Sequence, residues 1–451
     1  MKKSYQKLLG DKDFNELIKG GGISFFFRLG GQALGYLLTL IIANLFGAKG
    51  LGDYVLAITI LKLFSVLAKF GLDTASIRFI ASYATKEKWQ SVLNLRKKVV
   101  NILSVTTVLS SLLMYFLADS IADLININVK YIRLNAFFVI PMVFFMLHYE
   151  SLRGLKKIAE FSFFYRMSQA LISIIAIVII YQFTNDSEVP IYAYLTSVLV
   201  VSFLAYLSFR YHLIKHANSK DSVNEDFMSY SKLLDISIPL MFAESVQFIM
   251  VWIDKLMLGN MTTVEDVGIY FTAFKLSMIA SISLMSINSI ASPKFAEKFG
   301  KNDINGLRKV VQQSTKMIFW TSFPLVAGFF IIPEYLLSLF GEEFKVGVTA
   351  FIFLSCGRLV SSFCGSVGNI LKMTNNQNIF GLLLFCGAVI NVVLNFVLIP
   401  ENNLLSSYGI SGINGAAFAS MCSLSFWNLA MVLIVKRKFG FFTFYLPFFK
   451  R

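Results

Sequence analysis

The chain has 451 residues, of which 56% are hydrophobic and only 15% are charged, and its mean hydropathy is +0.67. Soluble proteins carry charge on about a quarter of their residues, so this composition excludes an ordinary soluble globular protein. The net charge of +15 does not indicate a nucleic-acid partner, because the cations lie in short polar segments between long apolar runs. Such runs predict membrane-spanning helices, since a helix satisfies its own backbone hydrogen bonds inside a bilayer.

The apolar runs predict twelve transmembrane helices, each long enough to cross a hydrocarbon core of about 30 Å. The charged segment before residue 21 has no signal-peptide pattern, so we expect the first apolar run to be a span itself. The predicted spans lie near residues 22–46, 54–76, 99–118, 129–150, 161–182, 190–213, 233–259, 267–292, 313–333, 346–371, 378–399 and 410–435.

Lys and Arg residues outside the predicted spans lie almost entirely on one side of the membrane. The side that holds the amino terminus carries 31 of them, and the other side carries four, Lys49, Lys130, Arg133 and Lys345. Because cytoplasmic loops are enriched in Lys and Arg, both termini are predicted to be cytoplasmic. We therefore expect a multi-pass protein of a bacterial or archaeal cytoplasmic membrane.

The two halves of the chain resemble each other. A shift of 216 places GDYVLAITILKLFSVLAKFGLDTASIRF, from Gly52, over GIYFTAFKLSMIASISLMSINSIASPKF, from Gly268. Six spans per half make a parallel repeat, which is typical of transporters that work by alternating access. We predict an all-α integral membrane fold of two six-helix bundles around a central cavity. Residues 1–213 would form the first lobe, 214–232 a cytoplasmic linker, and 233–451 the second lobe with a basic tail.

Ten ionisable residues are assigned to the predicted spans, and cations near span ends, such as Lys130, Arg133 and Arg166, are counted with the loops. Each of the ten costs about 2.5–3.5 kcal/mol at a helix centre unless water or a partner solvates it. The excess of cations over anions predicts a cavity for an anionic substrate. The candidate substrate-binding residues are the cations Arg28, Lys62, Lys69, Lys255, Lys275 and Arg358. The candidate ion-coupling residues are Asp73, Glu244 and Asp254, and the tenth residue is Glu150.

Several of these residues have structural alternatives. Spacing along a continuous helix places Lys62, Lys69 and Asp73 on one face of the second span, so Asp73 could simply pair with Lys69. Arg28 is near the end of its span and could extend its charge to the interface. Asp254 is either neutralised by the adjacent Lys255 or is a proton or sodium site, and the sequence leaves both possibilities open. In the tenth span, a polar stripe is expected from Arg358 through Ser361, Ser362 and Ser366 to Asn369.

No pattern of catalytic residues is present. None of the three histidines has a second ligand at metal-binding spacing, and there is no phosphate-binding glycine loop. The four cysteines lie in apolar runs and are expected to pack as small hydrophobic residues. We therefore expect a protein that is not an enzyme and that uses no metal or cofactor.

Three stretches carry loose glycine and aromatic patterns: ANLFGAKGLGDYVLAITI (Ala43–Ile60), FGLDTASIRFIASY (Phe70–Tyr83) and LIPENNLLSSYGISGINGAAFAS (Leu398–Ser420). They resemble Wzx-type polysaccharide and O-antigen flippases, which belong to the multidrug/oligosaccharidyl-lipid/polysaccharide exporter superfamily. The resemblance implies a V-shaped pair of bundles with Arg28 as a cavity cation. The implied substrate is an oligosaccharide on a polyprenyl pyrophosphate, flipped from the cytoplasmic to the outer leaflet.

The partners implied by this resemblance are membrane lipids, the lipid-linked oligosaccharide and, as possible protein partners, a polysaccharide polymerase and glycosyltransferases. Two alternatives remain open. One is a drug/cation antiporter of the same superfamily, for which fewer intramembrane cations are expected. The other is a membrane scaffold that recruits polymer-assembly enzymes through its basic loops.

The distribution of Lys and Arg predicts which loops are cytoplasmic. Single cysteines that replace Lys88, Lys220 and Lys301 should react with an impermeant maleimide only after the membrane is opened. Labelling of any of the three in intact cells would contradict the predicted orientation. A cysteine in place of Lys345, on the opposite side, is the positive control.

Overall fold

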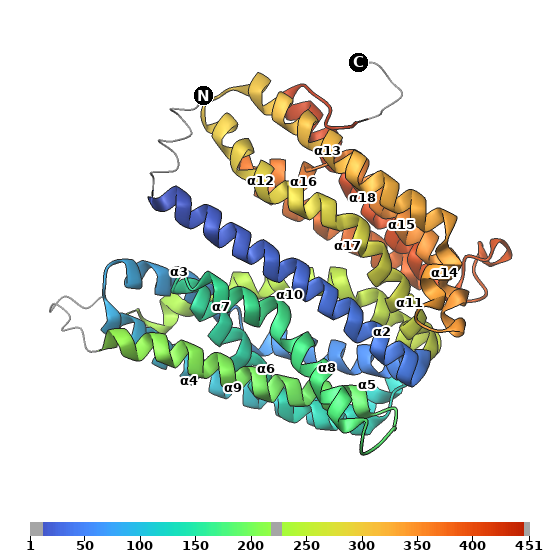
Figure 1. Cartoon of the computed structure of the whole chain (residues 1–451), viewed down its shortest axis with the longest axis horizontal. Coiled ribbons are helices and arrows are strands. Elements are labelled where there is room, and N and C mark those ends of the chain that lie inside the picture. Colours follow the sequence, from blue (N-terminus) through green and yellow to red (C-terminus); the bar gives the residue numbers. More distant parts are fainter. Residues whose placement is uncertain (1–11, 218–227, 446–451) are drawn as a thin grey trace. The chain divides into compact units, whose positions relative to one another are not determined.

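The computed structural model describes residues 12–217 and 228–445, and these ranges consist of helices joined by short turns (Figure 1). No strand occurs within them, which confirms the predicted all-α fold. The first half contains α2 (Lys12–Ala68), α3 (Leu72–Thr85), α4 (Trp89–Phe116), α5 (Ala118–Ile125), α6 (Val129–Gly154), α7 (Ile158–Phe163), the π-helical η1 (Phe164–Ser168), α8 (Gln169–Ile180) and α9 (Val189–Ala217).

The second half begins with α10, which is followed by helices in a similar order. These elements are α10 (Tyr230–Met261), α11 (Val264–Ser277), the 3₁₀ turn η2 (Met278–Ala280), α12 (Ser281–Gly300), α13 (Ile304–Ile331), α14 (Pro333–Ser338), the 3₁₀ turn η3 (Glu342–Gly347), α15 (Val348–Cys364), α16 (Val367–Met373), α17 (Gln377–Leu398), the 3₁₀ turn η4 (Ser406–Tyr408) and α18 (Gly412–Phe439).

Eleven helices in the described ranges are long and apolar enough to span a membrane. The first of them, Gly22–Ala68, has 47 residues and contains Gly47 in a non-helical conformation with φ of 69°. At a rise of 1.5 Å per residue it would extend about 70 Å, more than twice the hydrocarbon thickness, so it contains two spans. The structure thus supports the predicted twelve.

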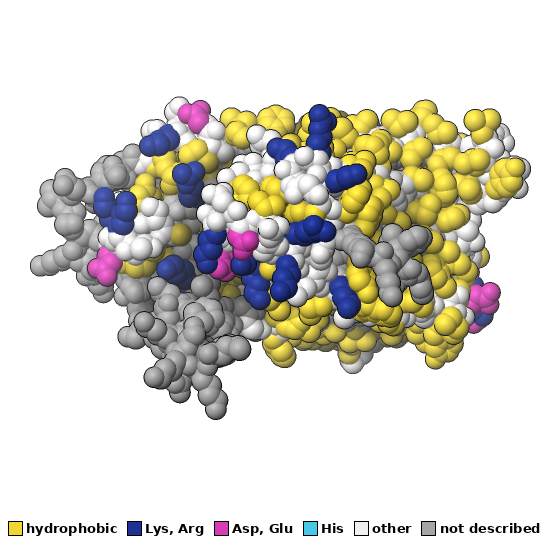
Figure 2. Space-filling model, turned by 90° about the horizontal axis from the view of Figure 1, so that it is seen from above, with side chains coloured by type: hydrophobic (Ala, Val, Ile, Leu, Met, Phe, Trp, Pro, Cys, Tyr) yellow, Lys and Arg dark blue, Asp and Glu magenta, His cyan; other side chains and the backbone are white. Residues whose placement is uncertain are grey.

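Hydrophobic side chains cover much of the described surface. Figure 2 shows a broad hydrophobic area on one face, with Lys and Arg side chains gathered in another part of that face. Large apolar residues such as Phe116, Phe183 and Ile331 are between 76% and 83% exposed. Because water would oppose such exposure, this surface is suited to lipid.

The second, eighth and tenth predicted spans are not continuous helices, which corrects the sequence-based prediction. The second is interrupted between α2 and α3, where Phe70 and Gly71 have φ of 54° and 69°. The eighth is interrupted by η2, and the tenth at Gly365, where φ is 75°. The predicted polar stripes along spans two and ten therefore do not follow one helix face.

The breaks in spans two and eight are stabilised in the same way. The hydroxyl group of Thr106, on α4, donates to the carbonyl oxygen of Ala68 over 2.7 Å. Similarly, the hydroxyl group of Ser322, on α13, donates to the carbonyl oxygen of Ala280 over 3.1 Å. The shift of 216 relates Thr106 to Ser322. In each half, a hydroxyl group of the following span thus donates a hydrogen bond to a carbonyl oxygen at the helix break. Inside a membrane no water is present to do so.

Four turns repeat one backbone pattern, in which a residue in the left-handed region ends the helix and the next N–H donates to the carbonyl oxygen five residues earlier. The left-handed residues are Glu87, Lys156, Asn302 and Asn375, with φ between 54° and 59°. These turns follow spans two, four, eight and ten, which are equivalent positions in the two halves. The hydrogen bonds are Lys88 to Tyr83 (3.0 Å), Lys157 to Leu152 (2.9 Å), Asp303 to Lys298 (3.0 Å) and Asn376 to Leu371 (2.9 Å).

The contacts group the chain into two compact units, neither of which is continuous in sequence. Unit 1 contains Met1–Ile42 and Ala57–Phe248, and unit 2 contains Ala43–Leu56 and Ile249–Arg451. Helix α10 is therefore shared, because Phe248 and Ile249 lie within it. The units differ from the predicted lobes at residues 43–56 and 233–248, and the predicted linker lies partly outside the described residues.

Within unit 2, two backbone segments pack against each other reciprocally. A Cβ atom added to Gly52 would lie 1.9 Å from the carbonyl oxygen of Val264, and one added to Gly268 would lie 2.1 Å from that of Ala48. The shift of 216 relates Gly52 to Gly268 and Ala48 to Val264. Each contact therefore repeats the other, as across a local twofold axis, and this supports the parallel repeat.

This contact predicts the effect of an added methyl group. Gly268→Ala should destabilise the protein by about 1–3 kcal/mol, because a backbone carbonyl group must move to admit the new methyl group. The control is Gly381→Ala in α17, where nothing lies within 4 Å of the new Cβ atom. That change should be neutral or stabilising by up to about 1 kcal/mol. Thermal unfolding in detergent measures both, and equal midpoints would contradict the contact.

Candidate functional site

In unit 1, α2 packs closely against the π-helical segment η1. A Cβ atom added to Gly31 would lie 2.3 Å from the carbonyl oxygen of Arg166, and Gly30 faces the sulfur of Met167 at 3.3 Å. The rings of Phe27 and Phe163 also meet edge to face, with centroids 6.1 Å apart. The absence of a side chain at Gly31 thus lets the two backbones approach, and it brings the neighbouring Arg28 and Arg166 into electrostatic contact.

Arg28 and Arg166 are cations on these two closely packed segments, and the guanidinium group of Arg166 lies 4.5 Å from the centroid of the Tyr165 ring. The Nε atom of Arg28 is buried and has no hydrogen-bond partner in the structure. Neither arginine makes an ion pair with a side chain of residues 22–214 or 228–445. Two guanidinium groups inside a membrane repel each other unless an anion lies between them, and each can offer parallel N–H donors to a phosphate group.

Arg166 was missed by the sequence analysis, which counted it among the loop cations. Its position falls inside the predicted span 161–182, and the structure places it in η1, within the span Ile158–Ile180. The apolar run that begins at Ile158, eight residues before the arginine, indicates in the sequence that Arg166 lies inside a span. π-Helical turns within α-helices are frequent at functional sites.

Lys62, on α2, is also in unit 1 and is half-buried. Its ammonium group lies 5.9 Å from the centroid of the Tyr194 ring on α9. An aromatic face gives a cation partial stabilisation without neutralising its charge. Lys62 therefore keeps charge that an anionic ligand can use.

Lys69 belongs to a compact charged cluster with Asp73 and Glu244. It lies in the turn between α2 and α3, where its ammonium group is 2.8 Å from Asp73 and 2.5 Å from Glu244. The hydroxyl group of Thr74 also donates to Glu244 over 2.5 Å. The predicted pairing of Lys69 with Asp73 thus forms, although across a turn rather than along a helix. Two carboxylates already surround Lys69, so it has less charge to offer a substrate than Arg28.

Asp254 is the centre of a polar network in unit 2. It lies on α10 and is 3% exposed. Its carboxylate accepts hydrogen bonds from Tyr270 (2.7 Å), Asn395 (2.7 Å) and Ser420 (2.6 Å). The amide of Asn395 also donates to Asn391 (3.3 Å), whereas its buried Oδ1 atom has no hydrogen-bond partner in the structure. Carboxylate, amide and hydroxyl oxygens from α10, α17 and α18 thus meet in one place.

Lys255, next to Asp254, is almost completely buried at 1% exposure. Its ammonium group donates to the carbonyl oxygen of Val251 and lies 3.7 Å from the centroid of the Phe274 ring. Arg358 lies 5.4 Å from the centroid of the same ring. Lys275 lies over Phe271 at 5.4 Å. Lys255 is therefore enclosed, whereas Arg358 and Lys275 are half-buried.

The predicted site residues are divided between the two units. Unit 1 contains Arg28, Lys62, Lys69, Asp73 and Glu244, and unit 2 contains Asp254, Lys255, Lys275 and Arg358. The structure brings together Lys69, Asp73 and Glu244 in one group, and Asp254 with Lys255 near Arg358 in another. Convergence of all six cations on one cavity stays a prediction.

Comparison with known families gives two matches. The family model described as "Polysaccharide biosynthesis protein" matches residues 17–299. The model described as "MatE" matches residues 239–397. The first covers more than half of the chain.

Two curated relatives match parts of the chain. A probable low-salt glycan biosynthesis flippase of Haloferax volcanii is 23% identical over 175 residues, which are 39% of this chain and 35% of the relative. The capsular polysaccharide biosynthesis protein CapF of Staphylococcus aureus is 25% identical over 245 residues, which are 52% of this chain and 59% of the relative. The matched stretches thus cover less than two thirds of either relative.

Among solved structures, an inward-facing multidrug resistance MATE family transporter of the MOP superfamily has a similar fold. The TM-score is 0.73, with 15% sequence identity over 92% of this chain and 98% of that one. At this identity the similarity concerns the fold alone, and it agrees with the predicted transporter-like helical architecture.

Proposed function

Because this chain belongs to the polysaccharide biosynthesis protein family of the MOP superfamily, we propose that it is a flippase for a lipid-linked oligosaccharide. The substrate is an oligosaccharide on a polyprenyl pyrophosphate, which moves from the cytoplasmic to the outer leaflet for cell-surface polysaccharide synthesis. The names of the two curated relatives, a glycan flippase and a capsular polysaccharide protein, support this class of substrate. A polymerase and glycosyltransferases are the proposed partners in the same process.

The observation that carries this proposal is the pair formed by Arg28 and Arg166. These two guanidinium groups lie in membrane-spanning segments without a described carboxylate partner, so an anion there would relieve their repulsion. A pyrophosphate has several oxygens that can accept bidentate hydrogen bonds from arginine. Lys62, Lys275 and Arg358 are the further proposed substrate cations, because each is a half-buried cation that lies beside an aromatic ring.

A drug/cation antiporter is the main alternative, and the similarity to a multidrug resistance transporter favours it. An antiporter for cationic drugs needs anions or aromatic surfaces facing its substrate. The carboxylates nearest the predicted site are instead engaged, Asp73 and Glu244 by Lys69 and Asp254 by three donors. The unpaired arginines thus favour an anionic substrate over a cationic one.

Variants of these arginines test the proposal. Arg28→Ala and Arg166→Ala should each reduce flipping of a pyrophosphate-linked oligosaccharide in proteoliposomes by about tenfold or more, because each loses charged hydrogen bonds. If only the charge matters, Arg28→Lys should retain more flipping activity than Arg28→Ala. If bidentate contact is needed, the two variants should be equally impaired. The control is Lys86→Ala, a loop cation. Normal flipping by both alanine variants, or drug efflux without flipping, would contradict the proposal.

We also propose that the Asp254 network binds the coupling cation, a proton or a sodium ion. The unpartnered Oδ1 atom of Asn395, beside the Asp254 carboxylate, supports this role because a bound sodium ion would satisfy it. The network offers carboxylate, amide and hydroxyl oxygens, which suit a hard cation such as sodium. In the described part of the chain, no three His, Cys, Asp or Glu side chains are grouped as a transition-metal site would need.

Asp254→Asn tests this coupling role, because it keeps the shape of the side chain and removes its charge. Flipping by the variant should no longer respond to an imposed sodium or proton gradient, while the protein still folds. Glu401→Gln, in an exposed loop, is the matched control. A gradient response of Asp254→Asn equal to that of Glu401→Gln would contradict a cation site at Asp254.

A further inference from the structure

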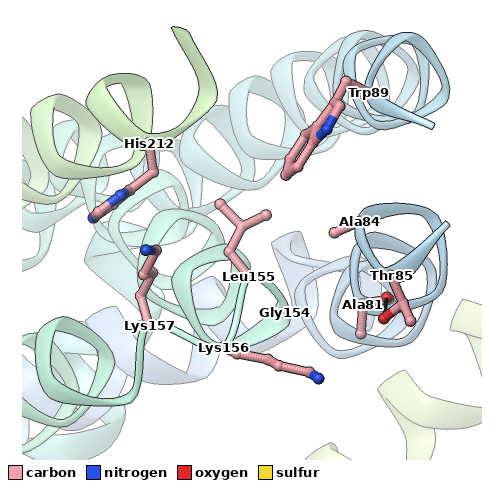
Figure 3. A pocket seen from close by; sticks show the side chains of 9 residues that line it. All are labelled: Ala81, Ala84, Thr85, Trp89, Gly154, Leu155, Lys156, Lys157 and His212. Atoms are coloured by element: carbon pink, nitrogen blue, oxygen red, sulfur yellow. Dashed lines mark hydrogen bonds between the residues drawn. The ribbon is translucent and has the colours of Figure 1, made fainter. Parts of the chain in front are cut away.

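A cavity lies in unit 1, and none of the proposed substrate-binding or ion-coupling residues lines it. It encloses about 230 Å³ between the ends of α3, α6 and α9 and the start of α4 (Figure 3). Small side chains line one wall, and an indole ring and basic side chains line the others. The lining residues are Ala81, Ala84, Thr85, Trp89, Gly154, Leu155, Lys156, Lys157 and His212.

Two of the four repeated turns form the rim of this cavity. Their left-handed residues are Glu87 and Lys156. The residue after each of them faces or flanks the cavity, since Lys157 lines it and Lys88 precedes the lining residue Trp89. The Lys and Arg distribution assigns both turns to the cytoplasmic side, at the depth where lipid headgroups meet water.

The cavity has a basic wall. In Figure 3 the ammonium group of Lys157 points toward His212, whereas the side chain of Lys156 extends on the other side, toward Ala81. His212 is not a free cation, because its Nε2 atom lies 3.0 Å from a carboxylate oxygen of Glu160. Lys157, by contrast, makes no ion pair in the described part of the chain. Lys157 is therefore the cation that a ligand on the His212 side of the cavity would meet.

The equivalent corner of unit 2 is filled. Phe295, Leu371 and Phe441 there belong to one buried core cluster, and Phe439 packs against it. The ring of Phe439 also meets that of Phe299, with centroids 6.1 Å apart. These residues lie beside the turns at Asn302 and Asn375, which correspond to the turns at Glu87 and Lys156. The repeat thus keeps the turns in both halves, with large apolar side chains packed beside them in the second half and a cavity beside them in the first.

We propose that this cavity binds the phosphate group of an anionic phospholipid from the cytoplasmic leaflet. Lys157 would pair with the phosphate oxygens, and Trp89 and Leu155 would contact the glycerol and the first acyl carbons. A combination of one cation, an interfacial tryptophan and an apolar floor matches a ligand that is charged at one end and apolar at the other. The site is separate from Arg28 and Arg166, so it does not depend on the proposed flippase activity.

The indole ring of Trp89 provides a direct test. Trp252, Trp320 and Trp427 are replaced by Phe, and the remaining fluorescence is measured in vesicles that contain acyl-brominated phosphatidylglycerol or acyl-brominated phosphatidylcholine. We expect stronger quenching by the anionic lipid. Lys157→Gln should weaken its apparent affinity about fivefold, as expected for loss of one cation near an anionic headgroup. Lys86→Gln, at an exposed cation of the turn after α3 that does not line the cavity, should leave it nearly unchanged.

The outcomes separate the possible ligands. Equal quenching by the two lipids, or equal loss in Lys157→Gln and Lys86→Gln, would overturn the proposal. Relief of quenching by millimolar inorganic phosphate at constant ionic strength would assign the phosphate site to a soluble ligand and overturn the lipid as its source. Ala84→Leu is a second variant that fills the cavity and keeps its charge. It should reduce quenching by phosphatidylglycerol, and unchanged quenching would contradict binding inside the cavity.

Discussion

Every interruption of a helix inside a membrane leaves backbone carbonyl groups that water cannot reach, and this constraint organises much of the structure. The breaks after Ala68 and at Ala280 persist because Thr106 and Ser322 donate to the exposed carbonyl oxygens. These hydroxyls occupy equivalent positions in the two halves. The duplication has therefore preserved the solution to the hydrogen-bonding problem together with the break itself, although the residue types differ.

Charged side chains inside the membrane also need partners. Several intramembrane charges are met locally, since Lys69 lies beside two carboxylates and Asp254 accepts from three donors. Arg28 and Arg166 stand apart because both are positive and the structure gives neither a described carboxylate. Burial of like charges is tolerated when the missing partner is a ligand, and this contrast distinguishes structural charges from proposed functional ones.

The sequence predicted the number of spans, the all-α fold and the repeat, because these depend on composition and periodicity. It did not predict the interruptions at Lys69–Gly71 and Gly365, because left-handed backbone at a residue such as Phe70 has no strong local signal. It also missed Arg166, whose position depends on where a span begins. Residues 43–56 belong to unit 2 through contacts of Ala48, Gly52 and Gly268 that are distant in sequence. Pairwise spacing cannot reveal such contacts.

Helix α10 carries two of the charged groups described above. It carries Glu244 in unit 1 and Asp254 in unit 2, and no proline or non-helical residue interrupts it between them. Ten residues of α-helix make a stiff rod of about 15 Å. Glu244, with its contacts to Lys69 and Thr74, and Asp254, with its three donors, therefore belong to one continuous helix. Both groups of contacts are attached to the same helical backbone, ten residues apart.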